Sequence, residues 1–441
     1  MTVTDGVTTL TGADVLSFTG TAALFAGTGG SLNGAHTVVN NGTIGFAVSG
    51  VTLSLVMAKG ALGDGANAGD TYVGVSVALT DAELIGVSGL ELYASGTLKV
   101  NAATDGITTL DLPTRMNWTL ATADANDPSF LLTNLDIIAA LELQVTGSAA
   151  VDIGNGALVA TVSGVELNLA TMTVTDGVTT LTGADVLSFT GTAALFAGTG
   201  GSLNGAHTVV NNGTIGFAVS GVTLSLVMAK GALGDGANAG DTYVGVSVAL
   251  TDAELIGVSG LELYASGTLK VNAATDGITT LDLPTRMNWT LATADANDPS
   301  FLLTNLDIIA ALELQVTGSA AVDIGNGALV ATVSGVELNL ATMTVTDGVT
   351  TLTGADVLSF TGTAALFAGT GGSLNGAHTV VNNGTIGFAV SGVTLSLVMA
   401  KGALGDGANA GDTYVGVSVA LTDAELIGVS GLELYASGTL R

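Results

Sequence analysis

The sequence predicts an all-β protein in which short β modules stack into an elongated, β-solenoid-like array; the alternative is a chain of tandem β-sandwich domains. Three observations lead to this prediction. Apolar residues alternate with small or polar ones, as in half-buried strands. Turn-forming pairs such as Asp5-Gly6 and Asn41-Gly42 separate these runs. The pattern also recurs at a fixed spacing, which is typical of stacked supersecondary units.

The recurrence is an identical tandem repeat. Residues 1–171 and 172–342 have the same sequence, and residues 343–441 repeat its beginning. We call these unit 1, unit 2 and the partial unit 3. The last residue is the one difference, because Arg441 stands where the earlier copies have lysine. The repeat indicates that the chain is a piece of a longer array.

Diverged motifs recur inside each unit. A Ser-Gly-Val/Leu-x-Leu motif begins at Ser49, Ser88 and Ser163. Such motifs divide the unit into about five modules of roughly 20–45 residues, the size expected of stacked β units. Coils that stack at about 4.8 Å would make a unit advance on the order of 25 Å along the array.

Period-two alternation is clearest in three runs, residues 73–79, 141–145 and 165–169. Aliphatic residues occupy one face of each run. In the first run the other face is small and uncharged, so we expect it to pack against another strand layer. In the other two runs that face carries Glu142, Gln144 and Glu166, which we expect to face water.

The charge is strongly acidic, with 37 acidic against 8 basic residues and a net charge of −29. Nucleic acids and anionic membrane surfaces are therefore unfavourable partners, because both require basic residues. The stretch 15–58 has no charged side chain, but its apolar residues alternate and do not run on for about 20 positions. We expect buried strands there and no membrane span.

A catalytic constellation is not evident. The chain has no cysteine, and a full unit has one histidine, two lysines and one arginine. His36 lies in a polar, loop-like segment, where a solvated histidine is the favoured interpretation. We predict that the chain is not an enzyme and has no catalytic residue or organic cofactor.

Calcium is the one ligand that the sequence favours. Calcium prefers several oxygen ligands from a flexible loop. Two loops of unit 1, with their equivalents in the later repeats, offer such oxygens, although neither has an EF-hand pattern, and acidic turn residues more often bond to their own backbone. The weak candidate ligands are Asp64, Asn67 and Asp70 in one loop and Asp124, Asn126 and Asp127 in the other.

Several strings resemble the repeats of giant bacterial extracellular proteins of the adhesin-like or haemolysin type. They are Val48-Ser-Gly-Val-Thr-Leu53, Tyr72-Val-Gly74, Ala82-Glu-Leu-Ile-Gly-Val-Ser-Gly-Leu-Glu-Leu92 and Lys99-Val-Asn101. The resemblance implies an extracellular, elongated, adhesive or filament-forming protein. It implies no catalytic or binding residue, and the calcium motif of many such proteins is missing.

The leading functional hypothesis is therefore a non-catalytic extracellular or cell-surface stalk, fibre or filament. Its expected partners are neighbouring copies of itself, joined end to end or laterally. The alternative is an adhesin-type binding module in which the inserted loops 27–43 and 60–71 recognise a cell-surface glycan or another cell, with repetition supplying avidity.

Overall fold

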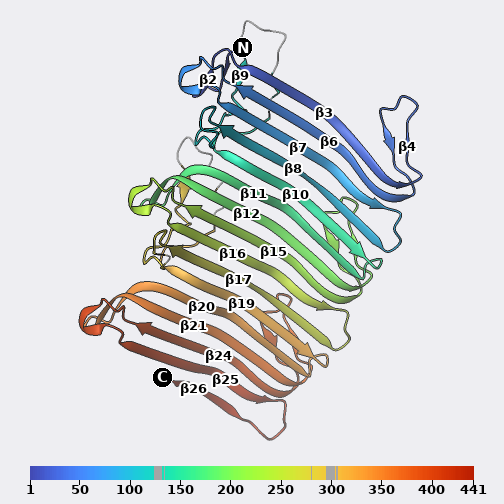
Figure 1. Cartoon of the computed structure of the whole chain (residues 1–441). Coiled ribbons are helices and arrows are strands. Elements are labelled where there is room, and N and C mark those ends of the chain that lie inside the picture. The colour runs from blue at the N-terminus through green and yellow to red at the C-terminus, as the bar shows by residue number, and fades with distance from the viewer. Residues whose placement is uncertain (124–131, 134, 280, 295–302, 304–305) are drawn as a thin grey trace.

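The computed structural model is a single, open antiparallel sheet whose strands follow one another in sequence order (Figure 1). The structure describes residues 1–441 except 124–131, 134, 280, 295–302 and 304–305. Every described pairing is antiparallel, and none joins the last strand to the first long one. The described part of the chain holds no helix long and apolar enough to cross a membrane.

Long strands make up most of the sheet, and a full unit supplies six of them. Unit 1 contributes β3 (Asp14–Thr28), β6 (Ile44–Lys59), β7 (Thr71–Ile85), β8 (Leu90–Thr104), β10 (Leu141–Ile153) and β11 (Leu158–Thr175). The later units contribute β12 (Thr180–Thr199), β15 (Ile215–Lys230), β16 (Thr242–Ile256), β17 (Leu261–Thr275), β19 (Leu312–Ile324), β20 (Leu329–Thr346), β21 (Thr351–Thr370), β24 (Ile386–Lys401), β25 (Thr413–Ile427) and β26 (Tyr435–Leu440).

Short elements lie in the connections between the long strands. Two-residue strands form hairpins at one end of the sheet: β4 (Ser31–Leu32) with β5 (Val39–Asn40), β13 (Ser202–Leu203) with β14 (Val210–Asn211), and β22 (Ser373–Leu374) with β23 (Val381–Asn382). At the other end lie β1 (Val3–Thr4), β2 (Thr9–Leu10), β9 (Thr122–Ala123), β18 (Thr293–Ala294) and the 3-10 turns η1 (Gly65–Asn67), η2 (Gly236–Asn238) and η4 (Gly407–Asn409).

The all-β prediction is confirmed, but the solenoid is wrong. In a solenoid each strand pairs with the equivalent strand of the next coil, whereas here each long strand pairs antiparallel with the next long strand along the chain. Tight turns reverse the chain, as at residues 154–157, where Gly154, Asn155 and Gly156 all have positive φ. The described residues also contain no second large sheet facing the first, so the alternative of tandem sandwiches is not observed either.

The recurrent Ser-Gly motif marks positions that need a left-handed backbone. Gly50 and Gly164 have φ of 62° and 58° and lie at register shifts inside β6 and β11. Gly89 has φ of 74° and lies in the turn between β7 and β8. Glycine reaches this conformation without a steric penalty. The motif therefore serves bulges and turns alike and does not delimit the five expected modules.

The two faces of the sheet differ in chemistry. Successive residues of a strand point to opposite faces, and the cross-strand register extends each set over its neighbours. On β8 one face carries Thr97, Lys99 and Asn101, and we call it the polar face. The other carries Leu98 and Val100, and we call it the aliphatic face.

The hydrophobic core lies over one end of the polar face. The described parts of residues 105–140 in unit 1 and 276–311 in unit 2 fold back over the sheet there, together with the segment that precedes each first long strand. Trp118, Met116 and Ile137 are at most 2% exposed beneath this cover. The core is therefore built between the sheet and its own connecting segments.

Candidate functional site: the polar face

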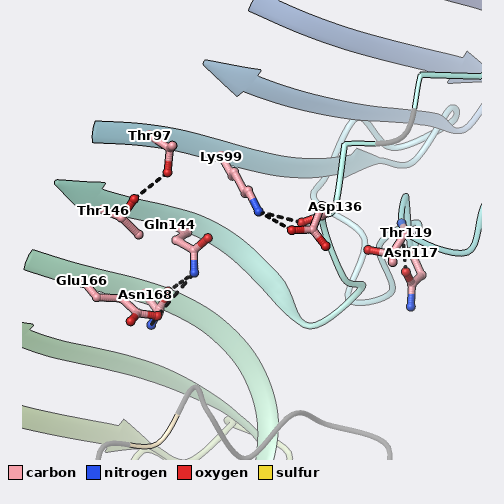
Figure 2. Close-up of polar contacts among 9 residues, drawn as sticks. All are labelled: Thr97, Lys99, Asn117, Thr119, Asp136, Gln144, Thr146, Glu166 and Asn168. Carbon is pink, nitrogen blue, oxygen red and sulfur yellow. Dashed lines mark hydrogen bonds and ion pairs between the residues drawn. The ribbon is translucent and has the colours of Figure 1, made fainter. Parts of the chain in front are cut away.

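Polar side chains form rows across the polar face between the covering segment and the hairpins. Thr97 of β8 lies opposite Thr146 of β10, and their hydroxyl oxygens are 2.6 Å apart. Thr146 in turn lies opposite Glu166 of β11. Figure 2 shows these residues projecting from neighbouring strands toward one another. Strand alternation alone places them on one face.

A hydrogen-bonded network forms the next row. The Gln144 side-chain amide donates to Asn168 Oδ1 at 2.9 Å, and the Asn168 amide donates to Glu166 Oε1 at 3.0 Å (Figure 2). Asn168 also donates to the Ser188 hydroxyl of unit 2 at 3.3 Å. The same network recurs around Gln315. Polar side chains thus tie one unit to the next.

Two ion pairs hold the covering segment on the sheet. Lys99 Nζ contacts Asp136 Oδ2 at 3.0 Å and donates to the Asp136 carbonyl at 2.9 Å (Figure 2). Arg115 Nη2 contacts Glu142 Oε1 at 2.6 Å, and the Thr171 hydroxyl donates to the same oxygen at 2.6 Å. Glu142 and Gln144, expected to face water, are therefore only partly exposed and engaged in polar contacts.

A buried tryptophan anchors the cover. The Trp118 indole N–H donates to Asn101 Oδ1 at 3.0 Å, and the Asn101 amide donates to the carbonyls of Met116 and Ile138 at 3.0 and 3.1 Å. Gly74 makes room for it, since a Cβ there would lie 2.5 Å from Leu135 and 2.6 Å from the indole nitrogen. Asn101 thus satisfies the indole and two main-chain groups together.

An open groove remains on the polar face. In unit 2 it has a volume of about 500 Å³. Its lining combines hydroxyl-bearing side chains and one carboxylate with small and aliphatic residues; the polar side chains are Thr251, Ser266, Thr268, Thr317, Ser319 and Glu337. Nothing in this lining resembles an activated nucleophile, because the only ionisable group among its lining residues is Glu337. The groove can offer hydrogen bonds to a polar ligand.

The hairpins join adjacent units. The β13–β14 hairpin of unit 2 reaches back over unit 1, and His207 stacks on Tyr93 of β8 with ring centroids 3.3 Å apart and planes 9° apart. His378 stacks on Tyr264 in the same way. We call this contact the Tyr–His clasp. His36 of unit 1 is exposed, as expected of a solvated loop histidine. Sequence reasoning did not find the contacts of its equivalents His207 and His378, because the stacked rings are far apart in the sequence and no local motif links them.

The first candidate calcium loop is a brace between backbone segments. Asp64 Oδ2 accepts the Thr11 N–H at 3.0 Å, and Asp70 Oδ1 accepts the Gly106 N–H at 2.9 Å. Asn67 donates to the Thr9 carbonyl at 3.1 Å. The described residues hold no cluster of three or more acidic or histidine side chains placed for a metal. Calcium binding here stays a prediction, and equal melting temperatures in excess calcium and in chelator would count against it.

The second candidate loop, Asp124, Asn126 and Asp127, lies outside the described residues. A different acidic residue, Asp5, was not singled out by sequence reasoning. Its carboxylate accepts the N–H groups of Val7, Thr8 and Asn117 at 2.7 to 2.9 Å, and it is 7% exposed. An Asp-Gly turn was the only available signal, and it gave no hint of the long-range contact to Asn117.

Tyr72 of β7 is buried beside this acidic brace. Burial raises its pKa to about 12, and the negative charges of Asp70, Asp5 and Asp64 add to the shift. Burial likewise raises the pKa of Tyr243 in unit 2. In both units the fold favours the neutral phenol.

This raised pKa predicts a loss of stability in alkali. A tyrosine whose folded pKa exceeds its unfolded value of about 10 stabilises the fold fully below that value, and this contribution is lost as the pH rises through about 12. We expect urea midpoints to fall between pH 10 and 12, and less so in a Tyr72→Phe/Tyr243→Phe variant. An equal fall of the urea midpoint with pH in wild type and in this variant would contradict the assignment.

No family model, no curated protein and no solved structure matches the chain.

Proposed function

We propose that the chain is a non-catalytic structural protein whose repeats extend one β-sheet into a stalk, fibre or filament outside the cell. The observation that carries the proposal is the junction between units. Strand β11 runs through the end of unit 1, and its ladder to β12 contains fifteen register pairs. A junction of this kind adds a unit by ordinary strand pairing, so the sheet has no built-in limit.

Two further contacts support an extending array. The Gln144 network crosses from unit 1 into unit 2, and the Tyr–His clasp fastens the hairpins of units 2 and 3 to the preceding unit. Both contacts recur at the second junction. The absence of cysteine and the strongly acidic charge suit a soluble surface assembly exposed to salt. The described polar face is engaged in structural hydrogen bonds more than in any reactive arrangement.

Electron microscopy of chains with different numbers of units tests this function. A unit adds six strands spaced about 4.8 Å apart, so each added unit should lengthen the particle by roughly 29 Å. We expect uniform rods or ribbons whose length grows in this step. Compact particles whose length does not increase with unit number would overturn the proposal.

A polar binding function is the second candidate, and the groove of about 500 Å³ favours it. Its hydroxyl groups match the hydrogen-bonding needs of a glycan, and repetition of the groove along an array would supply avidity. The loops 27–43 and 60–71 remain the other proposed recognition elements. Wild-type protein that is retained by no glycan on an array would remove this candidate, whereas retention lost in a Thr268→Val/Thr317→Val variant would support the groove.

A further inference from the structure

Across the middle of the sheet the aliphatic face carries apolar side chains from strand to strand. One cross-strand row illustrates this, because the register places an apolar residue on each of fourteen consecutive long strands. The row consists of Leu53, Val77, Leu98, Val145, Leu167, Phe189, Leu226, Val246, Val271, Leu314, Leu340, Leu358, Met399 and Val415. It crosses both unit boundaries.

The neighbouring rows have the same character. Along β7 the aliphatic face carries Val73, Val75, Val77 and Leu79, and along β10 it carries Leu143, Val145, Gly147, Ala149, Val151 and Ile153. Between residues 73 and 79 of β7 and along β10, no charged, amide or hydroxyl side chain falls on this face; Thr71 lies at its margin. Charged residues reach this face only at its margin, where the register places Asp14 opposite Lys59 and Asp185 opposite Lys230, so the opposite charges offset each other.

The aliphatic face has no cover in the described structure. Its side chains remain half-exposed in the middle of the sheet; for example, Leu98 is 38% and Leu269 is 38% exposed. On the polar face, by contrast, Val56 and Val227 are fully buried. The covering segments and the hairpins all contact the polar face, as the contacts of Trp118 and His207 show.

The area of the aliphatic face indicates what kind of partner could cover it. Sixteen strands about 4.8 Å apart, with about 13 residues each rising about 3.3 Å, give a face on the order of 3,000 Å². The largest apolar patch on an ordinary monomer is about 300–600 Å². A standard stable interface buries about 800 Å² per partner. The face therefore exceeds what a stable dimer needs by several-fold.

We propose that two copies of this chain pack through their aliphatic faces and form a two-layer β-sandwich ribbon. A second copy supplies an aliphatic sheet face of the same length and repeat. Sheets pack face to face about 10 Å apart with interdigitating side chains. The pairing also leaves the two acidic polar faces on opposite outer surfaces, where their repulsion is smallest. A lipid surface is less suitable, because the net charge of −29 opposes anionic membranes.

The pairing places a second chain on the aliphatic face of the elongated sheet proposed above. It depends on that proposed function only for its biological role. Particle length per unit tests the elongated sheet, whereas particle mass and thickness test the pairing. A ribbon of correct length and single mass would leave the function standing and remove the pairing. Paired particles whose length does not grow with added units would support the pairing and contradict the proposed function.

The experiment compares two charge insertions in adjacent residues of the same strands. In the first variant Leu53, Leu224 and Leu395 of the aliphatic face become lysine. In the matched control Thr52, Thr223 and Thr394, one residue earlier and on the polar face, become lysine. Both variants gain the same charge on β6, β15 and β24. Mass photometry and sedimentation velocity of the full chain give the mass.

We expect wild type and the threonine control to sediment at twice the chain mass of 43.0 kDa and the leucine variant at the single mass. Far-UV circular dichroism checks that the leucine variant retains its sheet. If it does not, the thickness of wild-type particles by X-ray scattering decides, with two sheet layers expected and one layer contradicting the proposal. Single-mass wild type, or single chains bound to phosphatidylcholine vesicles, would overturn the pairing.

Discussion

Replacing Trp289 with alanine should cost about 3–5 kcal/mol of stability, the range for deleting a large aromatic side chain from a core. Trp289 is 3% exposed in the cover of unit 2, and its indole N–H donates to Asn272 Oδ1 at 3.1 Å. The substitution leaves a cavity against Gly245 and removes a partner of buried Asn272. We expect the described parts of residues 276–311 to detach while the strand ladder beneath them persists.

Amide hydrogen exchange measures this effect segment by segment. Protection should fall in the described parts of residues 276–311 and in β17, and remain near the wild-type level in β12 and β15. Trp118 is the only other tryptophan, so its fluorescence reports whether the cover of unit 1 stays folded.

A Trp289→Phe variant is the control, because it keeps most of the apolar volume and removes the indole donor. We expect it to lose clearly less stability than the alanine variant. Alanine and wild-type proteins with the same urea midpoint and the same exchange pattern would show that the cover contributes little to the fold.

The alternation of residues correctly separated the two faces of each strand but did not reveal which face is covered. In the run 73–79 the small side was expected to meet another strand layer. Gly74 on that side indeed lies against Trp118 and Leu135, but these belong to a connecting segment and not to a strand. The valines of the same run form the open aliphatic face. Period-two patterning specifies two sides, whereas their partners depend on distant residues.

The solenoid prediction failed for a related reason. Strands in a solenoid and in an antiparallel meander have the same period, and the repeat length is compatible with both. The choice depends on the connections, because short turns such as 86–89 and 154–157 return the chain directly beside the preceding strand. Several Asp-Gly and Asn-Gly pairs were recognised as turns, yet their number did not indicate how the long strands would pair.

The first candidate calcium loop shows the same limit of sequence reasoning. Loop residues Asp64, Asn67 and Asp70 were chosen for their oxygen atoms, and in the structure these residues bond to the backbone of segments 1–13 and 105–110. Sequence reasoning could identify polar loop residues, but it had no means of finding backbone N–H groups contributed by residues 53 and 36 positions away. The same holds for the Tyr–His clasp.

The repeat boundary at residue 171 does not coincide with a structural boundary. Strand β11 begins in unit 1 and ends in unit 2, and Ser188 of unit 2 completes the network around Asn168. A single unit would leave strand edges and the aliphatic face exposed. Stacked repeats gain stability from their neighbours in this way, so added units are expected to stabilise the array.

Replacing Asp176 with alanine should destabilise unit 2 by on the order of 3 kcal/mol, because hydrogen bonds to a charged group contribute about 1.5–3 kcal/mol each and are not additive. Its Oδ1 accepts the N–H groups of Val178 and Thr179 at 2.9 and 2.7 Å. Its Oδ2 accepts the Asn288 N–H of the covering segment at 2.7 Å. Asp176 is 7% exposed, so the N–H groups that lose this acceptor have little access to water as a replacement.

Asp347 of the partial unit 3 supplies a matched control. It accepts the equivalent turn bonds from Val349 and Thr350 at 2.8 and 2.7 Å, but it is exposed and the chain here includes no covering segment for it to hold. We expect Asp347→Ala to lower the urea midpoint much less than Asp176→Ala, and only the latter to increase hydrogen exchange at Asn288. Equal losses would show that the aspartate acts through its turn alone, and that the carboxylate does not fasten the cover to the sheet.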